Sequence, residues 1–285
     1  MKEFIIAGIG ELLWDMLPTG KQLGGAPCNF VYHAQRLGAK GITVSAVGED
    51  ASGKEIRETL QKKGLSTAYI QQNSYPTSTV DIVLDDKGVP NYIIHEEVAW
   101  DFIEYTDAVD EMIAEADAVC FGSLAQRNSI SRLAIKAALG RCKPECLKIF
   151  DINLRQHYYS KEEIESSLQV SNILKLNEDE LPVVCDLLKI EGTDHLEQLR
   201  ALIAKYHLKL IAYTLGANGS YLVSSQEDSF MPTPKVEVKD TVGAGDAFTA
   251  AMTVGLLQNK SLKEIHRNAV ELSAFVCTQN GAMPE

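Results

Sequence analysis

The residues with the clearest chemical potential form one string near the end of the chain, Asp240-Thr241-Val242-Gly243-Ala244-Gly245-Asp246. The alternating residues 235–238 before it predict a strand, and the small and apolar residues 247–257 after it predict a buried helix. Gly243 and Gly245 carry no Cβ, so the backbone there can turn sharply and approach a ligand closely. Because the first N–H groups of a helix are unpaired and partly positive, this turn would form an anion hole suited to phosphate.

Asp246 falls in the first turn of the predicted helix, directly after the anion hole. The helix dipole would hold a carboxylate there in its charged form. It could then accept a proton from a hydroxyl that attacks a phosphorus above the hole. A structural interpretation fits the same residues, in which Asp240 caps the helix and Asp246 only complements its dipole. The string taken alone leaves both interpretations open.

The composition narrows the classes of partner. The chain has 285 residues, 45% of them hydrophobic, and a net charge of −12. This charge disfavours nucleic acid and anionic membrane surfaces as partners, and no apolar run approaches the length that spans a membrane. The N-terminus does not resemble a signal peptide. The spacing of the six cysteines indicates neither a disulfide framework nor a zinc site, so we expect a cytoplasmic protein with free thiols.

Two glycine-rich segments resemble nucleotide-binding loops only in part. Gly8-Ile9-Gly10 is half of a dinucleotide fingerprint, but Leu13 stands where the third glycine belongs. The segment 48–55 fits the spacing of a P-loop, but Glu55 occupies the position that needs a hydroxyl for Mg²⁺. We interpret this second segment as a strand followed by a capped helix over residues 51–63.

A third glycine-rich segment runs from Leu23 to Asn29. Pro27 suits the first turn of a helix. Asn29 would then face the mouth of the turn, where its amide offers a donor and an acceptor to sugar hydroxyls. An ordinary helix entry is the alternative.

The remaining pattern predicts an α/β fold. Apolar strands at 3–9, 42–47, 117–121, 147–150, 173–176 and 208–214 alternate with helical segments, which indicates a mostly parallel sheet with helices on both faces. Residues 67–95 instead alternate as short strands, with a turn expected at 85–88. Such an inserted antiparallel sheet suggests a lid or small subdomain, and its exposed edges suggest pairing with a second copy.

Polar residues at the carboxyl ends of parallel strands are expected to line one crevice. Here they are Asp15, Asp151, Arg155, Asn177, Glu180, Thr214 and the loop 240–246. Asn177 and Glu180 have the spacing of a capping box. Carboxylates at this edge can also hold a hydrated Mg²⁺ on ATP phosphates, and the two interpretations are compatible.

In order and from end to end, these segments resemble the ribokinase-like (PfkB) family of sugar kinases. The matching motifs are Gly10-Glu11-x-x-x-Asp15, Gly24-Gly25-Ala26-Pro27-x-Asn29, Gly48-x-Asp50-x-x-Gly53, Asn177-x-x-Glu180, Thr214-x-Gly216-x-x-Gly219 and Asp240–Asp246. Within the family, the second motif and the segment 151–155 look most like fructokinases. The resemblance implies a three-layer ribokinase-like fold in one domain over residues 1–285. Its small β-sheet lid would come from about 12–23 and 67–100.

The resemblance also implies roles in an ATP-dependent sugar kinase. Asp246 would be the base that takes the proton of the sugar hydroxyl, and Gly243, Ala244 and Gly245 would form the anion hole. The implied sugar-binding residues are Asp15, Gly24, Gly25, Asn29 and Arg155. The implied nucleotide-binding residues are Asn177, Glu180, Thr214, Gly216 and Gly219. Glu180 would contact Mg²⁺ through water, Asp240 lies where some relatives bind K⁺, and the lid would form a homodimer.

The resemblance favours D-fructose as the substrate. Within the same reaction, 2-keto-3-deoxygluconate, ribose or a nucleoside are alternatives, and Arg155 could then serve a substrate carboxylate. Two other classes stay open: an NAD(P)-binding oxidoreductase that uses Gly8 and Gly10, and a non-catalytic sugar sensor. Since the transition state of phosphoryl transfer is loose and the hydroxyl loses its proton late, Asp246 need not have a raised pKa to act as the base.

Overall fold

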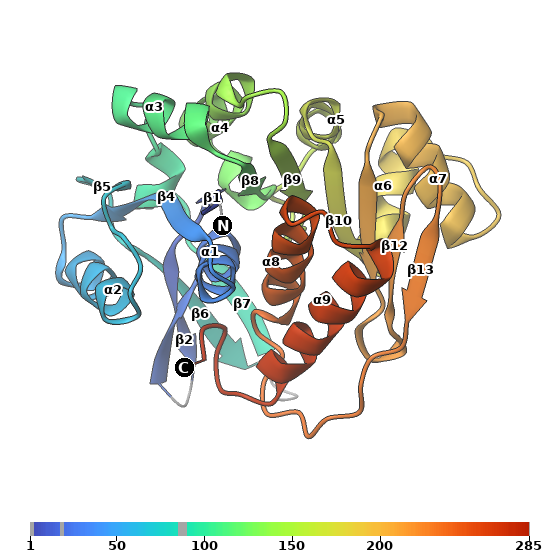
Figure 1. Cartoon of the computed structure of the whole chain (residues 1–285). Coiled ribbons are helices and arrows are strands. Elements are labelled where there is room, and N and C mark those ends of the chain that lie inside the picture. Colours follow the sequence, from blue (N-terminus) through green and yellow to red (C-terminus); the bar gives the residue numbers. More distant parts are fainter. Residues whose placement is uncertain (1–2, 18–19, 85–89, 285) are drawn as a thin grey trace.

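A nine-stranded sheet forms the centre of the computed structural model, which describes residues 3–17, 20–84 and 90–284 (Figure 1). The order of its strands is β13-β12-β11-β10-β9-β8-β1-β4-β5. Seven of them run parallel: β1 (Ile5–Ile9), β4 (Lys40–Gly48), β5 (Ile70–Asn73), β8 (Ala118–Phe121), β9 (Leu147–Asp151), β10 (Ile173–Asn177) and β11 (Leu210–Thr214). The antiparallel strands β12 (Ser220–Val223) and β13 (Asp228–Met231) complete one edge. The predicted mostly parallel α/β architecture is confirmed.

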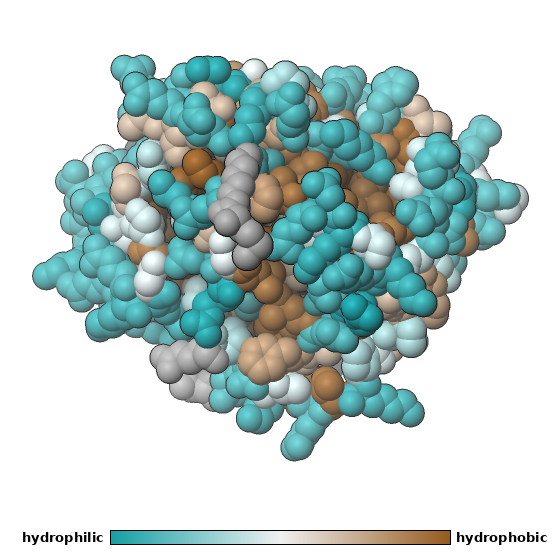
Figure 2. Space-filling model, viewed as in Figure 1, coloured by the Kyte–Doolittle hydropathy of each residue, from teal (hydrophilic) through white to brown (hydrophobic). Residues whose placement is uncertain are grey.

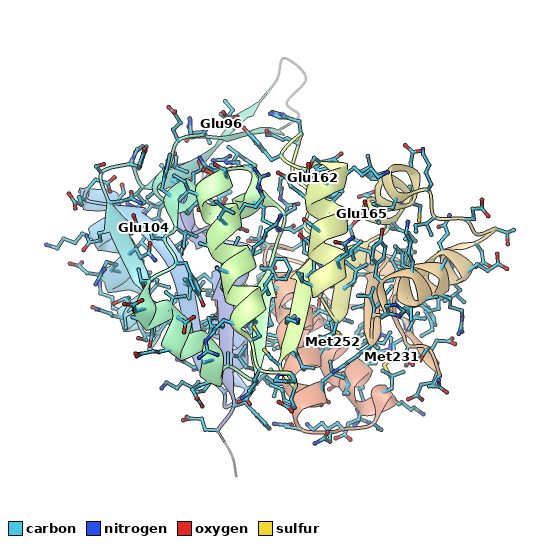
Figure 3. The ribbon with its side chains drawn as sticks, turned by 90° about the horizontal axis from the view of Figure 1, so that it is seen from above. Glu96, Glu104, Glu162, Glu165, Met231 and Met252 are labelled. Carbon is cyan, nitrogen blue, oxygen red and sulfur yellow. The ribbon has the colours of Figure 1, made fainter. Side chains whose placement is uncertain are left out.

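Helices cover both faces of this sheet. One face carries α1 (Ala26–Arg36), α2 (Ala51–Lys62), α8 (Ala244–Leu257) and α9 (Leu262–Cys277). The other carries α3 (Asp107–Glu115), α4 (Ser129–Arg141), α5 (Lys161–Val170), α6 (Glu180–Leu188) and α7 (His195–Tyr206). Figure 3 looks down on α4 and α5, with Glu162 and Glu165 on α5 and Met252 on α8 in the opposite layer.

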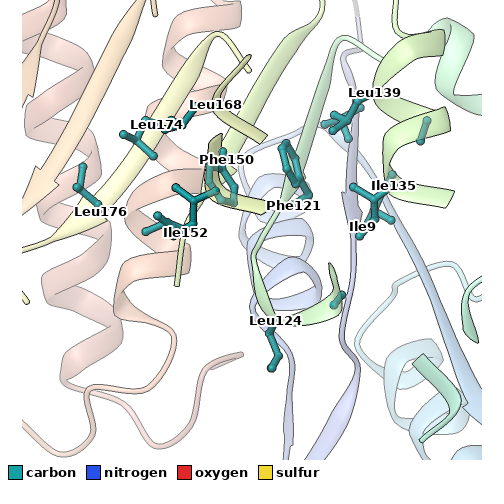
Figure 4. Packing of buried hydrophobic residues seen from close by; sticks show 14 of the residues in the cluster. Ile9, Phe121, Leu124, Ile135, Leu139, Phe150, Ile152, Leu168, Leu174 and Leu176 are labelled. Carbon is teal, nitrogen blue, oxygen red and sulfur yellow. The ribbon is translucent and has the colours of Figure 1, made fainter. Parts of the chain in front are cut away.

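Two hydrophobic cores follow from the alternation of side chains along each strand. On β9, Phe150 contributes to the core under α3–α7, and Ile149 contributes to the core under α1 and α8. Figure 4 shows the first core, where Phe121 and Phe150 stack at a ring separation of 5.1 Å. Because both faces of the main sheet are buried, the sequences of its strands are nearly continuous apolar runs.

A second, four-stranded sheet lies beside the main one, in the order β3-β2-β6-β7. It consists of β2 (Leu13–Leu17), β3 (Gly20–Gly24), β6 (Ser78–Leu84) and β7 (Pro90–Ile94). The expectation that residues 69–71 join this sheet is wrong, because β5 pairs in parallel with β4 in the main sheet. Its buried Ile70 closes an ordinary strand–helix–strand unit after α2. The turn expected at 85–88 lies outside the described residues.

The chain departs from the predicted elements at three further places. Residues 235–238 form no strand, and Val238 is 58% exposed, because the chain has already left the sheet edge after β13. Helix α3 and strand β13 are not predicted from the sequence pattern. Within the described ranges, no helix is both long and apolar enough to cross a membrane.

Candidate active site

Asp246 and Asn29 meet at the carboxyl edge of the main sheet. Helix α8 begins at Ala244, so Asp246 lies in its first turn as predicted. Asn29 lies on α1, and its Nδ2 donates a hydrogen bond of 2.8 Å to Asp246 Oδ2. Helices α1 and α8 pack against each other on the same face of the sheet, which brings together two residues 217 positions apart.

The start of α8 has the geometry of an anion site. Gly243 is the N-cap residue with φ 77°, and it supplies no side-chain acceptor to the first N–H groups of the helix. A Cβ at this glycine would collide with Ala282, so glycine is required both for the conformation and for the close approach of the C-terminal segment. Unpaired N–H groups at a helix start are suited to binding a phosphate, although the Ala244 N–H already donates to the Thr241 carbonyl at 3.3 Å.

The ionisation of Asp246 differs from the prediction. Burial raises the pKa of Asp246 to about 7, and the nearby charge of Asp151 adds to this effect. The hydrogen bond from Asn29 and the charge of Lys175 oppose the shift in pKa without cancelling it. The prediction that the helix dipole holds this carboxylate in its charged form is therefore wrong, because loss of solvent outweighs the dipole here.

Three of the residues predicted to bind sugar, Asp15, Gly24 and Gly25, lie together just before the start of α1. Asp15 is in β2, and a Cβ at Gly24 in the neighbouring β3 would collide with its carboxylate. Gly25 caps α1 with φ 119°, and a Cβ there would collide with the carbonyl of Glu11. The two glycines therefore make room for Asp15 and for the tight approach of the 11–12 backbone to α1.

Three carboxylates give this side a negative character. Burial raises the pKa of Asp15 to about 6, with Arg155 lowering it and Asp240 raising it. Glu11 is buried, and burial raises the pKa of its carboxyl as well. Arg155 is exposed at the edge of the site and its charge acts on both Asp15 and Glu11.

Two buried acceptors in this region have no partner among the described residues. They are Glu11 Oε2 and Asn29 Oδ1, on side chains whose other polar atoms are engaged. The sequence predicts no role for Glu11. Buried polar atoms normally have partners, so these two are candidates to bind hydroxyls of a ligand.

Asn177 and Glu180 form a reciprocal capping box at the start of α6. Asn177 Oδ1 accepts from the Glu180 N–H at 3.0 Å, and Glu180 Oε2 accepts from the Asn177 N–H at 2.8 Å. Glu180 Oε1 also accepts from the Leu154 N–H at 3.0 Å. The structural interpretation of this motif is thus confirmed, and each carboxylate oxygen keeps a lone pair that could accept from a hydrated cation.

The other residues predicted to bind nucleotide lie beside this box. Thr214 is the register partner of Asn177 in the neighbouring strand β11. Gly216 and Gly219 follow it with φ of 51° and 119°. A Cβ at Gly216 would lie 3.4 Å from Glu178 Oε1, while one at Gly219 would meet the Met231 carbonyl. The structure therefore brings these residues together at one end of β10 and β11.

Asp240 joins the loop before α8 to the C-terminal segment. Its Oδ1 accepts from the Val242 N–H at 3.0 Å, and its Oδ2 accepts from the Gly281 N–H at 3.1 Å. The Asp240 N–H in turn donates to the Cys277 carbonyl. The Asp240 carboxylate and the Cys277 carbonyl at the end of α9 are oxygen atoms of the kind that bind a hard cation.

One buried charged pair near the site was missed from the sequence. Lys175 Nζ lies 3.0 Å from Asp151 Oδ1, and both side chains are less than a tenth exposed. The carboxylates of Asp151, Glu180 and Asp246 raise the pKa of Lys175 although burial works against this. The sequence signal for this pair is a lysine inside the apolar run of β10, because lysines are rarely buried without a partner.

The two partial nucleotide-binding motifs have structural roles. A Cβ at Gly8 would collide with the Pro27 carbonyl, so this glycine lets α1 pack on β1 and opens no loop for a dinucleotide. Asp50 caps α2 by accepting from the Gly53 N–H at 2.7 Å. The Asp50 cap confirms that the segment 48–55 is a strand followed by a capped helix. The structural role of Gly8 removes the basis for the oxidoreductase alternative.

Comparisons with known proteins agree with this geometry. A family model described as pfkB family carbohydrate kinase matches residues 16–285. The ATP-dependent 6-phosphofructokinase of Thermoanaerobacterium thermosaccharolyticum is 29% identical over 99% of this chain and 90% of its own length. A fructokinase of Escherichia coli is 27% identical over 96% and 94%, respectively.

A crystal structure of a sugar kinase from Pyrococcus horikoshii in complex with ATP superposes with a TM-score of 0.84. It is 28% identical to this chain, and the match covers 98% of this chain and 95% of the other. The chain therefore belongs to the pfkB family of carbohydrate kinases and is an ATP-dependent sugar phosphotransferase.

Proposed function

We propose that this kinase transfers the γ-phosphate of ATP to a hydroxyl of D-fructose. Relatives named fructokinase support this choice, as does the resemblance of the glycine-rich segment 24–29 and the segment 151–155 to fructokinases. A 6-phosphofructokinase is also among the relatives. The main question is therefore whether the acceptor substrate is a neutral sugar or a sugar phosphate.

The balance of charge around Asp15 carries the proposal. Asp15 is acted on by the charge of Asp240, and Arg155 is the cation that acts on Asp15 and on the buried carboxyl of Glu11. Lys21, the basic residue in the described strands of the small sheet, is bound by Glu55. A phosphate on the acceptor would meet net negative charge here, whereas hydroxyls would find acceptors at Asp15, Glu11 and Asn29.

The mechanism that follows assigns proton transfer to Asp246. Its carboxylate would accept the proton of the attacking hydroxyl, with Asn29 holding it in place through the 2.8 Å hydrogen bond. The N–H groups of Gly243, Ala244 and Gly245 would stabilise the charge on the transferring phosphoryl group. Asn177, Glu180, Thr214, Gly216 and Gly219 would bind the nucleotide at the neighbouring strand ends.

Two cations complete the proposal. Mg²⁺ would accompany ATP and neutralise its phosphates, with Glu180 contacting its water shell through the lone pairs that the capping box leaves free. K⁺ would bind at Asp240 near the Cys277 carbonyl. Omitting each cation in turn from the assay tests these assignments, since activity should vanish without Mg²⁺ and fall without K⁺.

We further propose that residues 1–285 work as one cytoplasmic domain and that the small sheet covers the sugar and forms a homodimer. Met16 and Ile93 in this sheet are 39% and 45% exposed, which favours contact with an apolar partner surface. All six cysteines are free, as a reducing compartment would allow. Light scattering coupled to gel filtration measures the oligomeric state, and a Met16→Lys variant should shift a dimer toward monomer.

The substrate is tested by ADP production from Mg-ATP with D-fructose, fructose 6-phosphate, ribose, 2-keto-3-deoxygluconate, adenosine or no sugar. Selective turnover of D-fructose supports the proposal. Preference for fructose 6-phosphate or the keto acid would overturn it and assign Arg155 to a substrate anion. Asp246→Asn serves as the matched control for contaminating kinases. Absence of turnover with every sugar, despite ATP binding, would favour a sensor.

A further inference from the structure

We propose that Lys175 and Asp151 form a buried positioning pair that fixes the first turn of α8 for phosphoryl transfer. The inference rests on the proposed role of Asp246 as the base. Neither residue carries a role in the mechanism above. Both come from the centre of the main sheet, Lys175 from β10 and Asp151 from the end of β9.

The pair is connected directly to the turn that bears the anion hole. Asp151 Oδ1 accepts from Lys175 Nζ at 3.0 Å, and Asp151 Oδ2 lies 3.0 Å from the Thr249 hydroxyl on α8. The same hydroxyl lies 3.0 Å from the Gly245 carbonyl. One carboxylate thus links a lysine of the sheet to a hydroxyl one turn beyond the anion hole.

Lys175 also lies beside Gly245, a residue of the proposed anion hole. A Cβ at Gly245 would lie only 3.1 Å from Lys175 Nζ, closer than side chains normally pack. This glycine therefore provides space for the ammonium group as well as for a ligand. Since a misplacement of about 1 Å can cost roughly 10²-fold in rate, a fixed support beneath this turn is important for catalysis.

The charges around Asp246 explain why the support is ionic. Asp246 is faced by Asp151 of β9, Lys175 of β10, Glu11 after β1 and the amide of Asn29 on α1. Lys175 is the cation of this group, and the carboxylate of Glu180 also acts on it. Without Lys175, the charge of Asp151 would be buried and uncompensated beside the base, which is costly.

The test compares Lys175→Met, Asp151→Asn and the double variant by kcat, by KM for sugar and ATP, and by Tm. We expect Lys175→Met to lower kcat roughly 10- to 10²-fold with both KM values within a few-fold of wild type. The double variant removes both members of the pair, so its Tm should recover relative to Lys175→Met while its kcat stays low. Recovery of kcat together with Tm would show that the pair serves folding alone and would overturn the proposal.

Thr249→Val provides a second test in case the lysine variant fails to fold, because it keeps the shape and removes only the hydroxyl. It should lower kcat several-fold without raising KM for ATP, and an unchanged kcat would contradict the positioning role. Lys143 and Asp117 provide a matched control pair, with an N···O distance of 2.8 Å at the opposite end of the sheet. Lys143→Met should leave kcat unchanged.

The acid limb of the pH profile separates this inference from the proposed role of Asp246. If Asp246 is the base, Lys175→Met should move the limb to higher pH and Asp151→Asn should move it to lower pH. Opposite or absent shifts would overturn the positioning pair while leaving the base in place. Full activity in Asp246→Asn would overturn both.

Discussion

The Nδ2 atom of Asn29 lies 2.8 Å from the Oδ2 atom of Asp246. This hydrogen bond connects helix α1, early in the chain, to helix α8, late in the chain. It holds a carboxylate that is buried and faces the charge of Asp151. The hydrogen bond orients the Asp246 carboxylate, while burial and the charge of Asp151 destabilise its ionised form. Both properties have measurable consequences.

Replacement of Asp246 by Asn should lower kcat roughly 10²- to 10⁴-fold, the range for loss of a general base. The amide has nearly the same shape but cannot accept the proton of the hydroxyl. KM for ATP should change little, because the predicted nucleotide-binding residues lie at β10 and β11. Steady-state kinetics with saturating sugar measure both quantities, and near-wild-type turnover would exclude the role of base.

The pH profile of kcat/KM should show an acid limb. A base must be deprotonated to work, and Asp246 has a pKa raised to about 7 by burial. Activity should therefore fall as pH decreases through about 7, and more steeply once Asp15, with a pKa of about 6, also takes up a proton. Initial rates from pH 5 to 9 in one mixed buffer test this, and a flat profile down to pH 5 would contradict it.

The same group should make stability depend on pH. The folded pKa of Asp246 lies above its ordinary value of 3.8, so protonated Asp246 favours the folded state. This contribution is fully present below pH 3.8 and is lost as pH rises through about 7, reaching up to roughly 4 kcal/mol for three pKa units. Asp246→Asn removes the ionisation and should raise Tm more at pH 8.5 than at pH 5.

Thermal unfolding of wild type and variant at the two pH values measures this difference. Asp186→Asn is the matched control, since that carboxylate is 82% exposed and its ion pair with Lys189 lies at the surface. An equal change in Tm at both pH values for Asp246→Asn would show that burial of the charge does not strain the fold.

Gly24→Ala should weaken sugar binding selectively. The added Cβ would collide with the carboxylate of Asp15, which must move from the sugar side. We expect KM for the sugar to rise roughly tenfold or more, equivalent to loss of one charged hydrogen bond of about 1.5–3 kcal/mol, with KM for ATP unchanged.

Gly140→Ala is the control for that substitution. Gly140 lies in α4, and a Cβ there meets no atom within 4 Å. Alanine should leave both KM values unchanged and stabilise the helix by up to about 1 kcal/mol. If Gly24→Ala behaves in the same way, Asp15 does not contact the sugar.

The sequence alone determined the features that depend on local rules. The alternation of apolar strands with helices predicted the main sheet, and the segment 240–246 predicted a glycine-capped helix start with Asp246 in its first turn. The capping of α2 by Asp50 was predictable for the same reason. Periodicity, capping and glycine positions act within a few residues, so they can be read without the fold. Local alternation failed where tertiary pairing decides, as at 235–238 and in β5.

The tertiary structure decided what surrounds the base. The contact between Asn29 and Asp246, the support of Asp151 by Lys175 and Thr249, and the raised pKa of Asp246 depend on the packing of α1, α8, β9 and β10. Desolvation is set by every atom that excludes water from a carboxylate, and those atoms come from distant parts of the chain. Spacing along the sequence therefore located the proposed base, while its ionisation and its supports emerged only from the folded arrangement.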